Sequence, residues 1–218
     1  MARQFLDIDY LNRMLAEGEH QQQDFKYKIT DACKLAKSVS AFANTDGGRL
    51  MIGVRDDGHL SGVRSEEEVY MMQVAAEEYC RPAAEISFER LVAEGRQIVI
   101  AHVPISPHKP IRAMCDDGRY RAFIRVADEN IVASPVHVRI WKDEQSPKGQ
   151  VFTYSEIENK VFAALQTNNL QTLNQIVRRS RVKRPQVIIT LARMIRFGLM
   201  ECRFSDHQFL FGQLEIEG

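Results

Sequence analysis

The spacing of apolar residues predicts an alternation of helices and strands over the first two thirds of the chain. Apolar residues recur at three- and four-residue steps, as on one buried helix face, over 9–17, 30–43 and 65–79. Alternating or continuous apolar runs predict strands over 24–29, 50–54, 59–63, 85–94, 97–103 and 119–126. Asp56-Asp57-Gly58 is a hairpin signal between the second and third of these strands. The order predicts an α/β (α+β) domain in which helices cover a mixed sheet.

The last third of the chain has the pattern of a helix-turn-helix followed by a hairpin. Helices are predicted over 155–166, 172–178 and 184–196, and two short strands over 199–204 and 208–211. This order is typical of a small winged helix-turn-helix domain. A polar stretch that contains Pro147 and Gly149 precedes it. We therefore predict a first domain over 1–143, a linker over 144–150 and a winged-helix domain over 151–218.

Composition places the chain among ordinary globular proteins, since 44% of its residues are hydrophobic and its formal net charge is zero. No apolar stretch reaches the roughly 18 residues of a membrane helix. The start of the chain lacks the pattern of a secretory signal, so a cytoplasmic location without membrane association is expected. The four cysteines lie far apart and have no histidine at metal spacing, which argues against disulfides and a zinc site.

The charge is uneven along the sequence. From Val151 onward there are nine Lys/Arg and six Asp/Glu, an excess of three positive charges that the rest of the chain balances. Five of the cations lie in one seven-residue window: Arg178, Arg179, Arg181, Lys183 and Arg184. Such a cluster at a helix start predicts contacts with DNA phosphates. The alternative is a solvated helix end without a ligand.

The helix predicted over 184–196 has a candidate base-reading side. Ile188, Leu191, Ala192 and Ile195 are spaced to face the core. On the other side this leaves Gln186, Thr190 and Arg193 to contact base edges in a major groove. A winged helix used for dimerisation, or for packing on the first domain, is the alternative. A two-fold homodimer is expected if the protein reads a palindromic site.

A series of motifs runs through the first domain. Asp24-Phe25-Lys26 follows Glu19, and the string A-F-A-N-T-D-G-G occupies 41–48. I-G-V-R-D-D-G at 52–58 and the pair Ile124-Arg125 come later. These motifs, within 7–134, resemble the AlbA_2 domain of Schlafen-type proteins. The resemblance implies a mixed α/β fold, and bacterial members with an appended winged helix are described as transcriptional regulators or ATP-binding proteins.

The helix-to-strand turn is a candidate ligand loop. Two adjacent glycines permit close approach of a phosphate, and backbone N–H groups there can point outward. The candidate residues of a nucleotide-binding loop, for which ATP is one candidate ligand, are Lys26, Asn44, Thr45, Gly47, Gly48 and Arg125. The chain lacks the G-K-[ST] of a P-loop. The alternative is a tight turn with no ligand.

The resemblance also implies a catalytic hypothesis. Glu19, Asp24 and Asp56 match three carboxylates of the nuclease members of the group, where Mg²⁺ would activate water for phosphodiester cleavage. Asp24 stands where the family usually has Glu, which shortens the reach. The net acidity of the domain argues against a nucleic-acid track on it.

Together these patterns favour a DNA-binding transcriptional regulator. Its winged helix would contact DNA, while the AlbA_2-like domain would bind a nucleotide, nucleic acid or a partner subunit. The alternatives are a metal-dependent nuclease that uses Glu19, Asp24 and Asp56, and a non-catalytic protein-interaction module.

Overall fold

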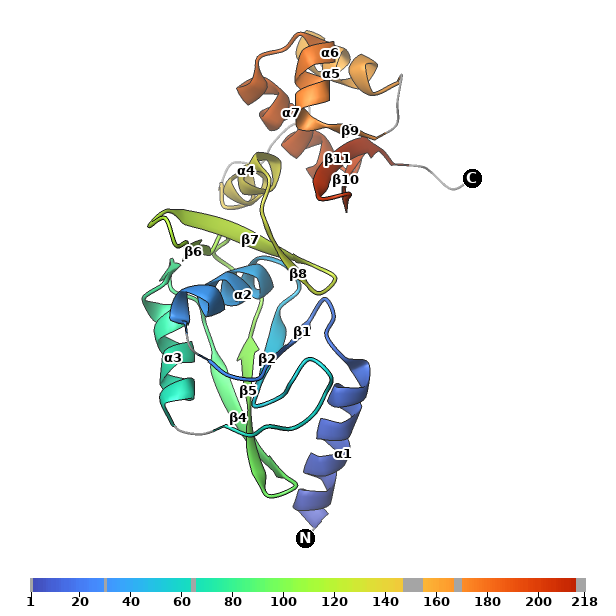
Figure 1. Cartoon of the computed structure of the whole chain (residues 1–218). Helices are drawn as coiled ribbons and strands as arrows, with labels where there is room; N and C mark the ends of the chain where they lie inside the picture. Colours follow the sequence, from blue (N-terminus) through green and yellow to red (C-terminus); the bar gives the residue numbers. More distant parts are fainter. Residues whose placement is uncertain (1, 30, 64–65, 147–154, 167–169, 215–218) are drawn as a thin grey trace. The chain divides into compact units, whose positions relative to one another are not determined.

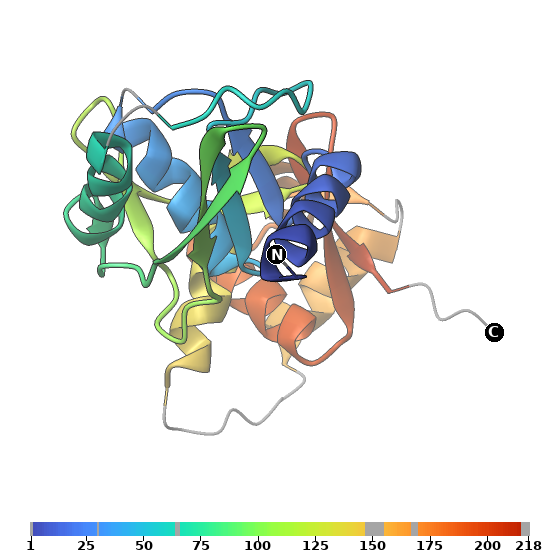
Figure 2. The ribbon, with the colours of Figure 1, turned by 90° about the horizontal axis from the view of Figure 1, so that it is seen from below.

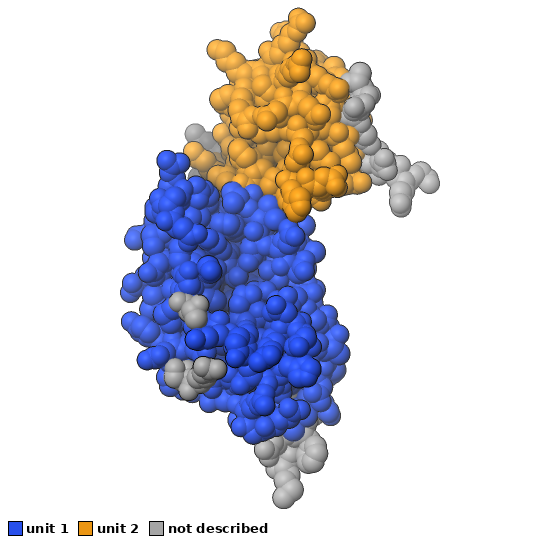
Figure 3. All heavy atoms as spheres, viewed as in Figure 1, with its two compact units in different colours: residues 1–132 blue, residues 133–218 orange. Residues whose placement is uncertain are grey.

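The computed structural model of the chain describes residues 2–29, 31–63, 66–146, 155–166 and 170–214 (Figure 1). The chain forms two compact units, Met1–Val132 and Ala133–Gly218 (Figure 3). Each unit has a hydrophobic core of its own.

A four-stranded mixed sheet is the centre of the first unit. Its strands follow the order β1 (Gln23–Lys26), β2 (Gly48–Ile52), β5 (Arg96–Val103) and β4 (Ser87–Ala93). β1 and β2 run parallel, whereas β2 with β5 and β5 with β4 are antiparallel. The mixed sheet with helices agrees with the predicted α/β class.

Helices cover both faces of this sheet, because its central strands are apolar on both sides. α1 (Ala2–Glu17) packs Leu11 and Met14 against side chains of one face, among them Met51. α2 (Ala32–Asn44) and α3 (Glu66–Glu77) pack on the opposite face, where Leu50 and Val99 point. The view along the sheet shows α1 on one side and α2 with α3 on the other (Figure 2).

A second, antiparallel sheet covers the outer side of α2. Its strand order is β3 (Cys80–Arg81), β6 (Arg112–Met114), β7 (Tyr120–Val126) and β8 (Glu129–Val132). Ala113 and Phe123 join the same core as the apolar residues of α2. Because α2 lies between two sheets, its polar side chains Ser38, Ser40 and Asn44 are also buried.

The strand predicted over 59–63 is reduced to a single bridge between Val54 and Leu60. The turn at Asp56-Asp57-Gly58 does form, with Gly58 at φ 81°. Beyond it, the N–H groups of Ser61 and Gly62 both donate to the carbonyl of Gly53. This close approach of two backbones replaces the regular ladder.

The second unit combines helices with a small sheet. Its elements are α4 (Pro135–Glu144), α5 (Glu156–Gln166), β9 (Gln171–Thr172), α6 (Leu173–Ser180), α7 (Arg184–Arg196), β10 (Met200–Ser205) and β11 (Gln208–Gln213). The strands form an antiparallel sheet in the order β10-β11-β9. The core contains Val161, Ile176, Leu191 and Phe211.

α4 belongs to the second unit, since it packs on α7 and its Val136 lies in the core of that unit. The division at Val132 thus differs from the boundary predicted at 143. The predicted linker over 144–150 falls partly outside the described residues, which end at 146 and resume at 155. Within the described residues, none of the helices has the length and apolar character to cross a membrane.

Candidate functional site

Arg125 on β7 is a fully buried cation that ties three parts of the first unit together. Its guanidinium donates to the carbonyl oxygens of His20 and Gln23, and Nη2 lies 3.4 Å from Asp24 Oδ1. The guanidinium carbon lies 5.1 Å from the centre of the Phe42 ring. Because its partners come from the chain itself, Arg125 holds the segment before β1 against β7.

Asn44 and Thr45 also direct their polar groups inward. Asn44 Nδ2 donates to the carbonyls of Ile111 and Phe123, at 2.7 and 2.9 Å, and its Oδ1 accepts from the Ile111 N–H. Thr45 Oγ1 donates to the carbonyl of Ala41 and accepts from the Arg125 N–H at 2.9 Å. Both side chains therefore join α2 to the neighbouring sheet.

The two glycines of this turn are required by its own geometry. Gly47 has φ 67°, a left-handed conformation that favours glycine. At Gly48, a Cβ would collide with the ring of Phe42 and lie 2.9 Å from the carbonyl oxygen of Gln22. The space beside Gly48 is thus filled by the protein, and the predicted ligand-loop residues Asn44, Thr45, Gly48 and Arg125 do not fit a nucleotide phosphate.

Glu19 and Asp24 lie side by side at the start of β1. Glu19 Oε1 accepts the Phe25 N–H at 2.8 Å, and Lys26 Nζ lies 2.7 Å from Asp24 Oδ2. That oxygen accepts no hydrogen bond of normal geometry, but the ammonium of Lys26 neutralises it. Burial, followed by the hydrogen bond and charge of Asp24, raises the pKa of Glu19 above its ordinary value.

The predicted catalytic set of Glu19, Asp24 and Asp56 is not assembled, which corrects that hypothesis. Asp56 is exposed and lines a hollow of about 420 Å³ with Tyr27, Arg55 and Asp57. In the described part of the chain, no three His, Cys, Asp or Glu side chains gather closely enough to hold a metal ion. Both carboxylate oxygens of Asp24 already face a cation of the chain, Oδ2 that of Lys26 at 2.7 Å and Oδ1 that of Arg125 at 3.4 Å. These residues therefore do not fit a Mg²⁺ site.

The second unit carries an exposed basic surface at the junction of α6 and α7. We call it the basic turn, and all five of its side chains are exposed: Arg178, Arg179, Arg181, Lys183 and Arg184. Between Asn159 and Met200 the sequence has eight Lys/Arg and no Asp/Glu. Clustered cations on a short, exposed segment create a positive potential that attracts polyanions.

Local interactions fix the shape of the basic turn. A capping box between Thr172 and Gln175 starts α6, and Val182 is buried beneath the turn. Arg181 has φ 55°, so a residue with a side chain occupies the left-handed conformation that ends α6. Lys183 precedes α7 without a capping hydrogen bond from its side chain. The positive end of the α7 dipole thus points among cations and suits a bound anion.

The two sides of α7 differ in part from the prediction. Thr190 is 2% exposed and belongs to the buried side with Val187 and Met194, which corrects its assignment to the outer side. Gln186 is exposed as predicted, whereas Arg193 Nη1 is bonded to Glu158 Oε1 at 3.1 Å. Because α7 is rich in apolar residues, the spacing of these residues predicted the position of its buried face only to within about one residue.

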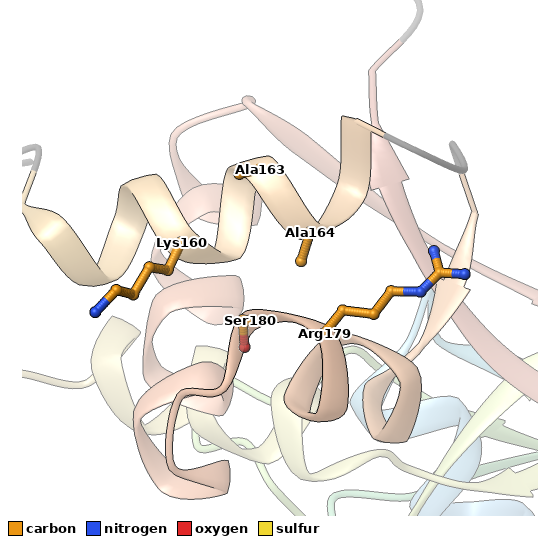
Figure 4. Close-up of a pocket in the computed structure, with 5 residues that line it drawn as sticks. All are labelled: Lys160, Ala163, Ala164, Arg179 and Ser180. Atoms are coloured by element: carbon orange, nitrogen blue, oxygen red, sulfur yellow. The ribbon is translucent and has the colours of Figure 1, made fainter.

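A shallow pocket of about 560 Å³ lies between α5 and the end of α6 (Figure 4). Ala163, Ala164 and Ser180 line it, and Lys160 and Arg179 mark its two ends. Lys160 Nζ lies 2.6 Å from Glu156 Oε1 on the same helix. Lys160 was not among the residues predicted from the sequence. The run without acidic residues that begins just before it, at Asn159, was the signal that could have found it.

The comparison with protein families concerns the first unit. A family model described as Schlafen, AlbA_2 matches residues 19–134, more than half of the chain. The chain belongs to this family. No curated protein matches the chain.

The solved structures that are similar to this chain include two from bacteria. The DIP2311 protein from Corynebacterium diphtheriae matches with 20% identity and a TM-score of 0.46, covering 77% of this chain. This chain spans only 40% of that protein. The other is the N-terminal domain of a protein from Nitrosomonas europaea whose name relates it to the ATP-dependent DNA helicase RecG. It matches with 21% identity and a TM-score of 0.42, over 69% of this chain and 96% of its own.

The Schlafen AlbA_2 match and the basic turn fall on different units. The matched residues include Glu19, Asp24, Asn44 and Arg125, whose contacts are internal to the first unit. The basic turn begins at Arg178, well beyond the end of the match at 134. The exposed basic turn therefore lies outside the matched family domain.

Proposed function

We propose that this Schlafen AlbA_2 protein is a transcriptional regulator that binds duplex DNA through its second unit. The observation that carries the proposal is the exposed basic turn, within a segment of eight cations and no acids, at the uncapped start of α7. Phosphate contacts dominate the affinity of proteins for DNA, and lysine and arginine supply them.

The order of elements supports treating the second unit as a winged helix. α5, β9, α6 and α7 are followed by the hairpin of β10 and β11, and β9 pairs with β11. Three residues, 181–183, separate α6 from α7. In proteins with this arrangement, the second helix of the helix-turn-helix enters the major groove. α7 would take that role, with its start toward the bases.

The pocket between α5 and α6 extends the proposed DNA-binding surface beyond the basic turn. Lys160 and Arg179 stand at its ends, on the side of α6 adjoining the basic turn. The ion pair of Lys160 with Glu156 is exposed and is worth little in water, so Lys160 can turn toward a phosphate. We propose that one backbone strand passes over this pocket.

In this proposal the AlbA_2 unit senses a ligand or assembles subunits, and a homodimer reads a two-fold DNA site. The buried Arg125 and Asn44 networks support a scaffold role for the residues that were predicted to hold a nucleotide. A two-fold dimer would place two copies of α7 on successive half-sites.

A salt titration of duplex binding tests the proposal. Fluorescence anisotropy of a labelled random duplex would be measured across roughly 50 to 300 mM salt. The triple variant Arg178→Gln, Arg181→Gln, Arg184→Gln is expected to bind about 10- to 100-fold more weakly at low salt. Its log–log salt slope should fall by about one for each lost phosphate contact.

A control variant removes two arginine charges from the first unit. Arg13 and Arg119 are exposed there, and the variant Arg13→Gln, Arg119→Gln should keep the affinity and slope of the parent. Equal affinity for the parent and the triple variant, or equal weakening by the control, would contradict binding through the basic turn.

A further inference from the structure

The outer side of α7 is a narrow stripe of four residues. Gln186, Ile189, Arg193 and Arg196 are spaced by three, four and three positions, which places them on one helix face. Gln186 and Arg196 are exposed, and Ile189 and Arg193 are partly exposed. If α7 lies in a groove, these side chains are the ones that can meet base edges.

Arg193 is already engaged within the protein. Its guanidinium bonds to Glu158, whose side chain is 5% exposed and whose Oε2 accepts the Ser155 N–H at the start of α5. Moving Arg193 onto a base would leave Glu158 buried and unpaired, which is strongly unfavourable. Arg193 is therefore a structural link between α5 and α7.

Gln186 then has the only neutral hydrogen-bonding side chain among the exposed positions of α7, because Thr190 is buried. It lies in the first turn of the helix, directly after Arg184 and Pro185. The N-terminal residues of a recognition helix are the ones that contact base edges. Ile189 follows one turn later and offers methyl groups on the same side.

The chemistry of this pair selects a base. A glutamine amide both donates and accepts, and it pairs bidentately with N6 and N7 of adenine. An aliphatic side chain next to it contacts the C5-methyl group of thymine. We propose that the first turns of α7 read A·T base pairs, with Gln186 on adenine and Ile189 against a thymine methyl. This inference rests on the proposed DNA-binding function.

Selection from a random duplex pool tests the inference. The parent is expected to enrich sites with adenine at a fixed position, and Gln186→Ala should lose this preference. On the enriched duplex, Gln186→Ala should bind about 10-fold more weakly. Its affinity for random duplexes, and the salt slope of that binding, should stay unchanged because the basic turn is intact.

Two modified bases test which atoms of the base pair Gln186 and Ile189 contact. Replacing the selected adenine by 7-deazaadenine removes N7, and should weaken the parent but leave Gln186→Ala unaffected. Replacing thymine by uracil removes the methyl group, and should weaken the parent but leave Ile189→Ala unaffected. Because Gln186 is exposed, its alanine variant should fold as the parent does.

The outcomes separate this inference from the proposed function. Salt-dependent binding that requires the basic turn, but shows no A·T preference or one that survives Gln186→Ala, would overturn base reading alone. An absence of duplex binding would overturn both.

Discussion

Several buried polar residues connect the elements of the first unit through hydrogen bonds. Asn44 takes part in three hydrogen bonds with backbone groups of Ile111 and Phe123, and Ser40 donates to Ile111 and accepts from Phe123. These contacts attach α2 to the second sheet where apolar packing alone would leave backbone groups unsatisfied. A single substitution at such a residue leaves several buried backbone groups without a hydrogen-bond partner.

Replacing Asn44 by alanine should therefore destabilise the protein by roughly 2–4 kcal/mol, since buried backbone groups lose their partners. Urea unfolding of Asn44→Ala would measure the change. Asn159→Ala is the control, because Asn159 is exposed on α5 and its loss should matter by less than about 0.5 kcal/mol. Equal midpoints for the two variants would show that the Asn44 amide is dispensable.

His137 gives the second unit a dependence on pH. Its ring packs beside Trp141 and Phe209, with centroid distances of 6.1 and 5.0 Å, and burial lowers its pKa to about 4. The unfolded chain has a histidine pKa of about 6.5. Between about pH 6.5 and 4, this histidine is therefore protonated in the unfolded chain but neutral in the folded one. Stability should fall as pH drops from about 6.5 toward 4, by up to about 3 kcal/mol.

Unfolding followed by fluorescence of Trp141, the single tryptophan, would report this transition. His137→Phe keeps an aromatic ring but cannot be protonated, so its stability should change less over the same pH range. A parent and a variant with parallel pH profiles would assign the dependence to other groups.

At the scale of elements, the turn between α6 and α7 combines strain with charge. Arg181 adopts φ 55°, which costs a residue with a Cβ about 1 kcal/mol relative to glycine. The stability of the backbone alone would favour glycine at this position. If the turn contacts DNA, the Arg181 side chain contributes to binding and not to the stability of the fold.

Arg181→Gly and Arg181→Gln separate these two properties. Both remove the charge and should weaken duplex binding by a similar factor. Only Arg181→Gly relieves the backbone, so it should be more stable than Arg181→Gln by about 1 kcal/mol. Thermal unfolding and anisotropy of the pair would test this, and a glycine variant that binds like the parent would remove Arg181 from the interface.

Sequence patterns predicted the long elements better than the short ones. α2, α7 and β5 have strong apolar periods, and the structure places them close to the predicted ranges. β3, β6 and β8 have two to four residues each and exist because distant strands pair with them, which no local period reveals. The sequence motif around Asn44 was identified. The inward direction of its amide could not be predicted, because its partners Ile111 and Phe123 come beside it only in the folded chain.

At the scale of the whole molecule, the two units have separate cores and different surface chemistry. The core of the second unit, which includes Val136, Leu191 and Phe211, draws all its residues from beyond 132. Residues 133–218 should therefore fold alone and bind duplex DNA with the salt slope of the full chain. Circular dichroism and anisotropy of this fragment would test both points, and a folded fragment without DNA affinity would assign binding to the first unit.

The buried Arg125 also sets an order of events during synthesis. Its partners His20 and Gln23 lie 105 and 102 residues earlier in the sequence. A nascent chain has to hold its N-terminal segment unfinished until β7 leaves the ribosome, because contacts of such separation close late. The segment before β1 is therefore expected to become fixed only after β7 has been made, while the core of the second unit needs no residue from before 133.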